Sequence, residues 1–325
     1  MRKAPDPHPN QDLFIRDLID YSPKDDRTLM ERPFFSLSKR KRNKPIEYES
    51  EDKSVYVKIT PHPEYGMATI WDADIMIWCI SKIVADKEKG SNLESRKIHT
   101  TPYEILRGIA RDTGGQNYRL LLDAMNRLKN TGITTNIRAK KGKFASFNWL
   151  AEFEGEGSIE TPEQMEKVRS ISLTLPGWIY DAVTTTSNVL TLDREYFLLS
   201  GGLDRALYRL ARKHAGQQAQ GWLCTFATLR QKTGSDSSEK KFAEMIKKSV
   251  KDNRLPRYEM TLKRTVDGLP AVHFVDRHIT GKTKLDEEIR LELERLSRMA
   301  EEDDRAELID SGVDPRKAAK RARVA

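Results

Sequence analysis

The amino-acid sequence predicts an α+β fold in which one order of elements, two helices followed by a β-hairpin, occurs twice. Three observations support this prediction. Apolar residues recur at the helical period in two separate regions, glycines separate the helices, and each region ends in two short strands around a turn. With 325 residues, the chain is long enough for two domains.

The first occurrence lies within residues 53–153. A strand is expected over 54–59, where apolar and polar residues alternate, and a helix with a wide apolar face over 72–86. A second helix starts near Thr101, because a hydroxyl, a proline and the carboxylate of Glu104 follow one another as a capping box requires.

A third helix and a hairpin complete this occurrence. After Gly114 and Gly115, residues 116–130 repeat apolar side chains every three or four positions, which predicts a helix. Strands are expected over 133–138 and 144–149. They enclose Lys140-Lys141-Gly142-Lys143, so the hairpin has a basic tip.

The second occurrence lies within residues 171–280. We expect a helix over 203–214, another over 225–233, a third marked by Phe242, Met245, Ile246 and Val250, and strands over 258–265 and 270–275. Two helices joined by a short turn and followed by a hairpin are the parts of a winged helix. The sequence therefore predicts two tandem winged helix-turn-helix domains with β-hairpin wings.

Three further segments complete the expected organisation. Residues 1–52 resemble an N-terminal arm, with a basic run at 39–44 that is either solvated or in contact with phosphates. Residues 154–170 begin with an acidic, glycine-rich stretch typical of a flexible linker. Residues 281–325 form a charged tail that we expect to be helical in part and otherwise disordered.

Charge favours an anionic partner. The net charge is +8; residues 281–311 contribute −5 and residues 312–325 contribute +4, so residues 1–280 hold the remaining +9. No apolar run reaches the roughly 20 residues that a membrane span needs, and residues 1–10 do not resemble a secretory signal. We expect a cytoplasmic, DNA-associated protein in which Cys79 and Cys224 are buried and reduced.

In a winged helix, the second helix of the turn enters the major groove of DNA, and the wing contacts the backbone. Asn117 and Arg119 lie early enough on the first such helix to reach base edges, because amides suit adenine and guanidinium groups suit guanine. The candidate DNA-binding residues of the first unit are Gln116, Asn117, Arg119, Asn126, Arg127, Arg138, Lys140, Lys141 and Lys143. Those of the second unit are Ser237, Ser238, Lys240, Lys241, Lys247, Lys248, Lys251, Lys263 and Arg264.

We find no pattern that indicates an enzyme, a metal site or a cofactor. The six histidines lack ligand spacing, and no glycine-rich loop carries the lysine that a triphosphate needs. Tyr196, Tyr208 and Tyr258 lack an accompanying base or acid cluster, so packing is the better interpretation of all three. The tryptophans lie in or beside apolar elements, which favours core packing over base stacking.

Four segments carry a resemblance to a known family: the run from Gly201 to Gly216, Asp12-Leu13-Phe14, Met30 to Ser38 and Leu192 to Phe197. On these residues the chain resembles the RepA-type plasmid replication initiators of Gram-negative bacteria. It extends over about residues 10–278 and leaves the charged tail outside.

This resemblance implies binding to directly repeated origin sequences (iterons), opening of nearby double-stranded DNA, and recruitment of the host initiator and replicative helicase. It also implies repression of the protein's own promoter and a homodimer that involves the first unit. The alternatives are a winged-helix transcriptional repressor without a replication role and an origin-nicking enzyme. The second of these lacks its metal ligands.

Overall fold

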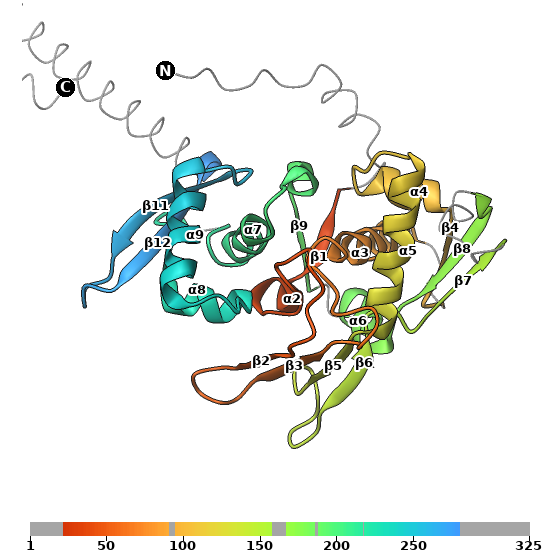
Figure 1. Cartoon of the computed structure of the whole chain (residues 1–325), viewed down its shortest axis with the longest axis horizontal. Helices are drawn as coiled ribbons and strands as arrows, with labels where there is room; N and C mark the ends of the chain where they lie inside the picture. The colour runs from red at the N-terminus through yellow and green to blue at the C-terminus, as the bar shows by residue number, and fades with distance from the viewer. Residues whose placement is uncertain (1–21, 91–94, 158–166, 186–187, 217, 280–325) are drawn as a thin grey trace, which may run out of the picture.

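The computed structural model describes residues 22–90, 95–157, 167–185, 188–216 and 218–279. The fold is α+β, as predicted, with helices beside sheets whose named strands pair antiparallel. Figure 1 shows the main helices in one row, with α5 (Gly115–Asn130) at one side, α9 (Glu239–Asp252) at the other, and α2 (Arg27–Glu31), α3 (Ala73–Glu88) and α7 (Gly202–His214) between them.

The first occurrence of the helix, helix and hairpin order is present. α3, α4 (Pro102–Gly108) and α5 are followed by β5 (Gly132–Thr135) and β6 (Ala145–Asn148). The predicted capping box is confirmed, because the Thr101 hydroxyl accepts from the Glu104 N–H at 3.1 Å and the Glu104 carboxylate accepts from the Thr101 N–H at 3.2 Å.

The hairpin of this first unit belongs to a larger sheet than expected. The four strands run in the order β2 (Ile46–Glu49), β3 (Tyr56–Thr60), β5 and β6. The turn between β5 and β6 projects away from the helices at the bottom of Figure 1.

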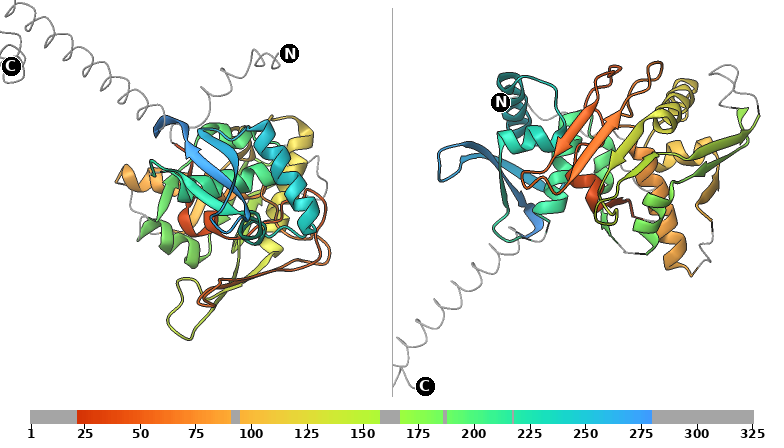
Figure 2. Two further views of the ribbon diagram at one scale, coloured as in Figure 1. Left: turned by 90° about the vertical axis from the view of Figure 1, so that its left-hand side faces the viewer. Right: turned by 90° about the horizontal axis from the view of Figure 1, so that it is seen from below.

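The second occurrence is also present. α7 and α8 (Phe226–Thr233) precede α9, and a three-stranded sheet has the order β10 (Trp222–Thr225), β12 (Pro270–Asp276) and β11 (Tyr258–Arg264). α8 ends at Gly234, whose φ of +63° is left-handed, and a Cβ there would lie 2.7 Å from Cβ of Pro33. Figure 2 shows the β11–β12 hairpin extending away from the body of the molecule.

The prediction of an N-terminal arm over residues 1–52 is wrong for the part that the structure describes. β1 (Lys24–Asp26) pairs with β9 (Val189–Thr191), and α2 contacts α7. Leu29, Phe34 and Phe35 are buried in the core. The basic run at 39–44 also contacts the second unit, because Arg42 donates to the Gly234 carbonyl at 2.9 Å. Residues 1–21 lie outside the described residues.

The predicted linker over residues 154–170 is also partly strand. β7 (Glu152–Glu156) pairs with β8 (Ser170–Thr174), and β8 pairs with β4 (Lys97–Thr100), which joins it to the first unit. At Gly155, a Cβ would come within 3.3 Å of the Ser170 carbonyl oxygen, so glycine here permits a close approach of two strands. Residues 158–166 and the charged tail lie outside the described residues.

The two units share one hydrophobic core. Helix α6 (Gly177–Thr184) contacts α3, and a buried ion pair joins α3 to α7, with 2.6 Å between Oδ1 of Asp74 and Nη1 of Arg205. The Arg205 guanidinium also donates to the carbonyls of Leu199 and Phe197. These bonds satisfy a charge that is fully buried, so the two units hold a defined position relative to each other.

Candidate nucleic-acid interface

Helix α5 presents part of the surface that the sequence predicts. Tyr118, Leu121 and Met125 are buried, and Gln116 and Arg119 on the opposite side are exposed. The Arg119 side chain has no hydrogen bond or ion pair within the part of the chain that the structure describes. Its guanidinium is therefore available for a base edge or a phosphate.

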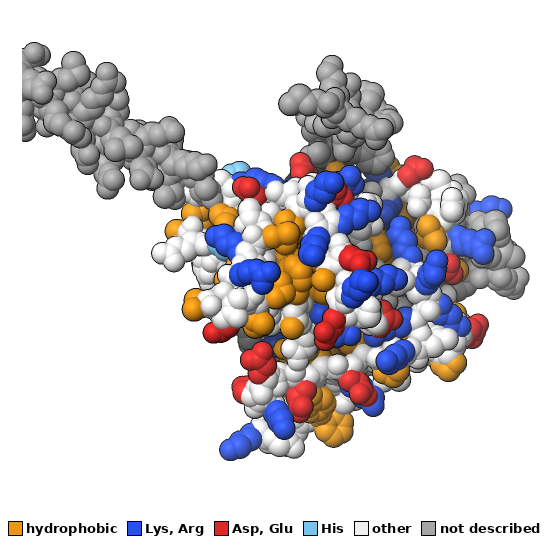
Figure 3. Space-filling model, turned by 60° about the vertical axis from the view of Figure 1, so that its left-hand side comes forward, with side chains coloured by type: hydrophobic (Ala, Val, Ile, Leu, Met, Phe, Trp, Pro, Cys, Tyr) orange, Lys and Arg blue, Asp and Glu red, His pale blue; other side chains and the backbone are white. Residues whose placement is uncertain are grey.

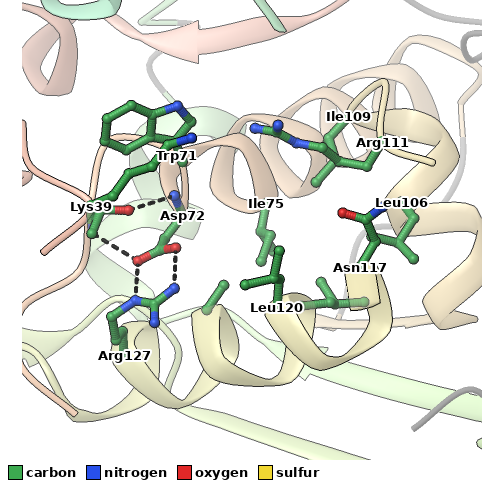
Figure 4. A pocket seen from close by; sticks show the side chains of 13 residues that line it. Lys39, Trp71, Asp72, Ile75, Leu106, Ile109, Arg111, Asn117, Leu120 and Arg127 are labelled. Carbon is green, nitrogen blue, oxygen red and sulfur yellow. Dashed lines mark hydrogen bonds and ion pairs between the residues drawn. The ribbon is translucent and has the colours of Figure 1, made fainter. Parts of the chain in front are cut away.

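Two other predicted residues of α5 line a pocket instead. Asn117 and Arg127 lie beside Leu120 and Trp71 around a cavity of about 220 Å³ between α3, α4 and α5 (Figure 4). Arg127 donates two hydrogen bonds to the carboxylate of Asp72, at 2.7 and 2.8 Å. The expectation that Arg127 points outward is wrong, because the buried Asp72 requires a cationic partner.

Two further candidates, Asn126 and Arg138, already have partners within the protein. Asn126 is half-buried and its carbonyl accepts from the Asn130 side chain at 2.8 Å. Arg138 has a left-handed φ of 60° and forms an ion pair with the buried Asp26. Its guanidinium also lies 4.5 Å from the ring centre of Trp178. Arg138 therefore closes the base of the β5–β6 turn.

Helix α9 carries the strongest basic face of the second unit. Phe242, Ile246 and Ser249 are buried, and the side of the helix away from them is lysine-rich. The exposed lysines are Lys240, Lys241, Lys247, Lys248 and Lys251. None of their ammonium groups has an ion-pair partner among the described residues, although Glu244 lies on the same face of the helix.

The serines before α9 have structural roles. The Ser238 hydroxyl caps the helix by accepting from the Lys241 N–H at 3.4 Å. The Ser237 carbonyl accepts from Nε of Arg230 at 2.9 Å, and its hydroxyl contacts the Met245 sulfur. Ser238 is exposed and Ser237 is half-buried, so Ser238 is the better placed of the two to meet a phosphate.

The predicted basic residues of both hairpins are exposed: Lys140, Lys141, Lys143, Lys263 and Arg264. Arg264 also donates to the Gly268 carbonyl at 2.7 Å, which leaves the rest of its guanidinium free to make a second contact. Figure 3 shows basic side chains spread over the face that holds α9, around a hydrophobic patch.

The sequence interpretation missed the exposed apolar side chains of the hairpin turns, Phe144, Val266 and Leu269. The available signal was a large apolar residue inside a turn segment, where polar residues and glycine are usual. The sequence analysis gave Phe144 to a strand and Val266 and Leu269 to a turn, without assigning a role to their apolar side chains.

The other predicted features agree with packing roles. Tyr196, Tyr208 and Tyr258 are fully buried, and burial raises the pKa of Tyr196 to about 12. A phosphodiester cannot reach hydroxyls in this position.

Cys79 and Cys224 are buried and are not joined to each other. Across the described ranges, no group of three or more His, Cys, Asp or Glu side chains could hold a metal ion, and no helix could span a membrane.

Comparisons with known proteins identify the class of protein. The family model "Replication initiator protein A" matches residues 24–260. A candidate replication protein of Wigglesworthia glossinidia brevipalpis is 33% identical over 252 residues, which cover 77% of this chain and 89% of that protein. The chain therefore belongs to the replication initiator protein A family.

Solved structures support the fold. A crystal structure of domains 2 and 3 of RctB aligns with a TM-score of 0.53 and 12% identity, over 74% of this chain and 94% of that one. At this identity the likeness concerns the fold alone. It extends across both units, as the shared core does.

Proposed function

We propose that this replication initiator binds directly repeated sequences at a plasmid origin through two winged-helix units, residues 53–153 and 171–280. The observation that carries the proposal is the repeated order of helix, helix and hairpin. In the first unit α5 exposes Arg119, and in the second unit α9 exposes a lysine-rich face. In each unit this is the last helix before the hairpin, and we assign it the role of the recognition helix of a winged helix.

The two units differ in the contacts that they offer. Arg119, with Gln116 beside it, suits the donor and acceptor groups of base edges in the major groove. The lysines of α9 are point charges that suit phosphates, which position a protein without reading sequence. We infer that α5 contributes more to sequence discrimination and α9 more to affinity.

We also propose the remaining steps of initiation, on the resemblance to plasmid replication initiators. Bound to its repeats, the chain opens nearby DNA and recruits the host initiator and replicative helicase. It represses its own promoter as a homodimer. These steps use binding energy and require no covalent chemistry by the chain.

The test uses the purified full chain and the DNA that flanks its gene. We expect direct repeats of about two helical turns beside an AT-rich stretch, each protected by one protein in a footprint. The footprint should cover two adjacent major-groove faces on one side of the duplex. Protection of a single groove contradicts the two-unit interface. Protection confined to the promoter, with no repeats, favours the repressor without a replication role.

A further inference from the structure

The two hairpin turns share a feature that the proposed contacts do not use: large apolar side chains exposed at their tips. Phe144 is 66% exposed after the β5–β6 turn. In the β11–β12 turn, Val266 is fully exposed and Leu269 is 53% exposed. Val266 and Phe144 are the two most exposed large apolar side chains among the described residues, and each lies at a turn that projects from the molecule.

The β11–β12 turn holds its apolar residues outward through its own hydrogen bonds. The Thr265 N–H donates to the Leu269 carbonyl at 3.0 Å, and the Gly268 N–H donates to the Thr265 carbonyl at 2.9 Å. The Thr265 hydroxyl accepts from the Leu269 N–H at 3.1 Å. A turn of this kind accepts proline or polar residues where Val266 stands, so the turn itself does not require valine.

The β5–β6 turn is held in a similar way. The Lys143 N–H donates to the Lys140 carbonyl at 2.8 Å, and Gly142 supplies the positive φ of 75° that such a tight turn needs. At its base, Nε1 of Trp178 donates to the Ile137 carbonyl at 3.0 Å. Phe144 therefore projects from a fixed base.

Cations flank the apolar side chains on both tips. Lys143 comes directly before Phe144 and Lys141 three positions before it, whereas Lys263 and Arg264 precede Val266, with Asp267 as the acidic exception. In the lower part of Figure 3, basic, acidic and hydrophobic side chains lie close to one another. A partner with an anionic rim and an apolar interior fits this arrangement, and duplex DNA has both, as phosphates and stacked bases.

We propose that the hairpin tips are wedges that enter the minor groove of the bound duplex, where Phe144, and Val266 with Leu269, press between base steps and unstack them. The inference rests on the proposed function, because the chain must first bind the duplex. Apolar side chains inserted in this way unstack and kink DNA, and flexible steps such as TA yield most easily. The wedges thus give the initiator a physical means to begin strand opening.

The experiment measures binding and unstacking separately on one probe. The probe is a duplex that the full chain selects from a random-sequence pool, with 2-aminopurine placed at its TA steps. Binding is followed by anisotropy and unstacking by 2-aminopurine fluorescence at saturating protein. The test variants are Phe144→Ser and the double variant Val266→Ser with Leu269→Ser, and the control is Leu198→Ser, an exposed apolar residue outside the hairpins.

We expect the parent and the control to raise the fluorescence alike. The serine variants should bind within about threefold of the parent, because phosphate contacts supply most of the affinity, and lose at least half of the fluorescence rise. An unchanged rise in both variants overturns the wedge and leaves the proposed function intact. Serine variants that cannot saturate the probe show that the tips are affinity contacts, which also overturns it.

Two other outcomes also overturn the wedge. If the tips join two copies of the chain, the serine variants change the mass measured by sedimentation without DNA, and their fluorescence rise equals that of the parent. If the parent selects no duplex from the pool, the proposed function fails and the wedge fails with it.

Discussion

Removing two lysines from α9 should lower the salt dependence of DNA binding by a calculable amount. Lys247 and Lys251 are exposed, have no ion-pair partner among the described residues, and stand four positions apart on one face of the helix. Each lysine that neutralises a phosphate contributes a slope of about −0.9 to the plot of log affinity against log salt. Replacing both by glutamine should therefore make the slope less steep by about 1.8.

When the salt concentration rises fourfold, the affinity of the parent should therefore fall by a factor roughly tenfold larger than that of the variant. The assay is an anisotropy titration of duplex DNA at several salt concentrations. The matched control replaces Lys89 and Lys167, which are exposed outside α9, and removes the same charge. An equal change of slope in the test and control variants would refute the assignment of a phosphate-binding face to α9.

Three further predictions concern other residues. Arg119→Ala should reduce discrimination between the preferred duplex and single-base variants of it by about 1–3 kcal/mol, whereas Lys141→Ala should weaken all duplexes alike; competition titrations distinguish the two effects. Arg205→Met should lower the free energy of unfolding in urea by about 3–5 kcal/mol, since it leaves the buried Asp74 without a main partner. Burial lowers the pKa of His214 from 6.5 to about 4. Between these two pH values, His214 therefore binds a proton in the unfolded chain but not in the folded one. The free energy of unfolding should therefore fall as the pH decreases from 6.5 to 4, and His214→Gln should flatten this dependence.

Each of these predictions has a contradicting result. Equal loss of discrimination in the Arg119 and Lys141 variants would contradict the separate roles of the two residues. A change below about 1 kcal/mol in the Arg205 variant would mean that the ion pair does not contribute as its burial implies. Parallel curves for the parent and the His214 variant between pH 4 and 6.5 would contradict the lowered pKa.

Local patterns were sufficient for α4, α5, α9 and the two hairpins, whereas α2 and α6 were not predicted. α5 and α9 carry apolar residues at the helical period, and the start of α4 has a capping box, so neighbouring residues alone specify these elements. Both hairpins were predicted for the same reason, since their turns contain glycine between alternating strands.

The strands that the sequence did not predict depend on backbone pairing between segments that lie apart in the chain. β1 is too short to be recognised, and its partner β9 lies more than 160 residues further along the chain. β7 looked like a linker because its acidic and glycine residues are poor strand formers, although backbone pairing with β8 requires no particular side chain.

The same cause explains two candidate site residues whose partners within the protein were not predicted. Arg127 and Arg138 have the positions of surface cations in their own segments, yet each faces a buried carboxylate from a remote segment, Asp72 and Asp26. Helical periodicity identifies which side of α5 is apolar. It does not show which charged residue on the other side already has a partner.

The central claim is that α5 and α9 contact the same duplex, and directed cleavage from the two helices tests it most directly. Cys79 and Cys224 are buried, so a single cysteine introduced by Arg119→Cys or Lys247→Cys can carry an iron chelate that cuts nearby DNA. We expect the two chelates to cut one selected duplex on the same side, at positions about one helical turn, roughly 10 base pairs, apart. Cleavage from only one of the two helices, or at positions unrelated by the helical repeat, would contradict it.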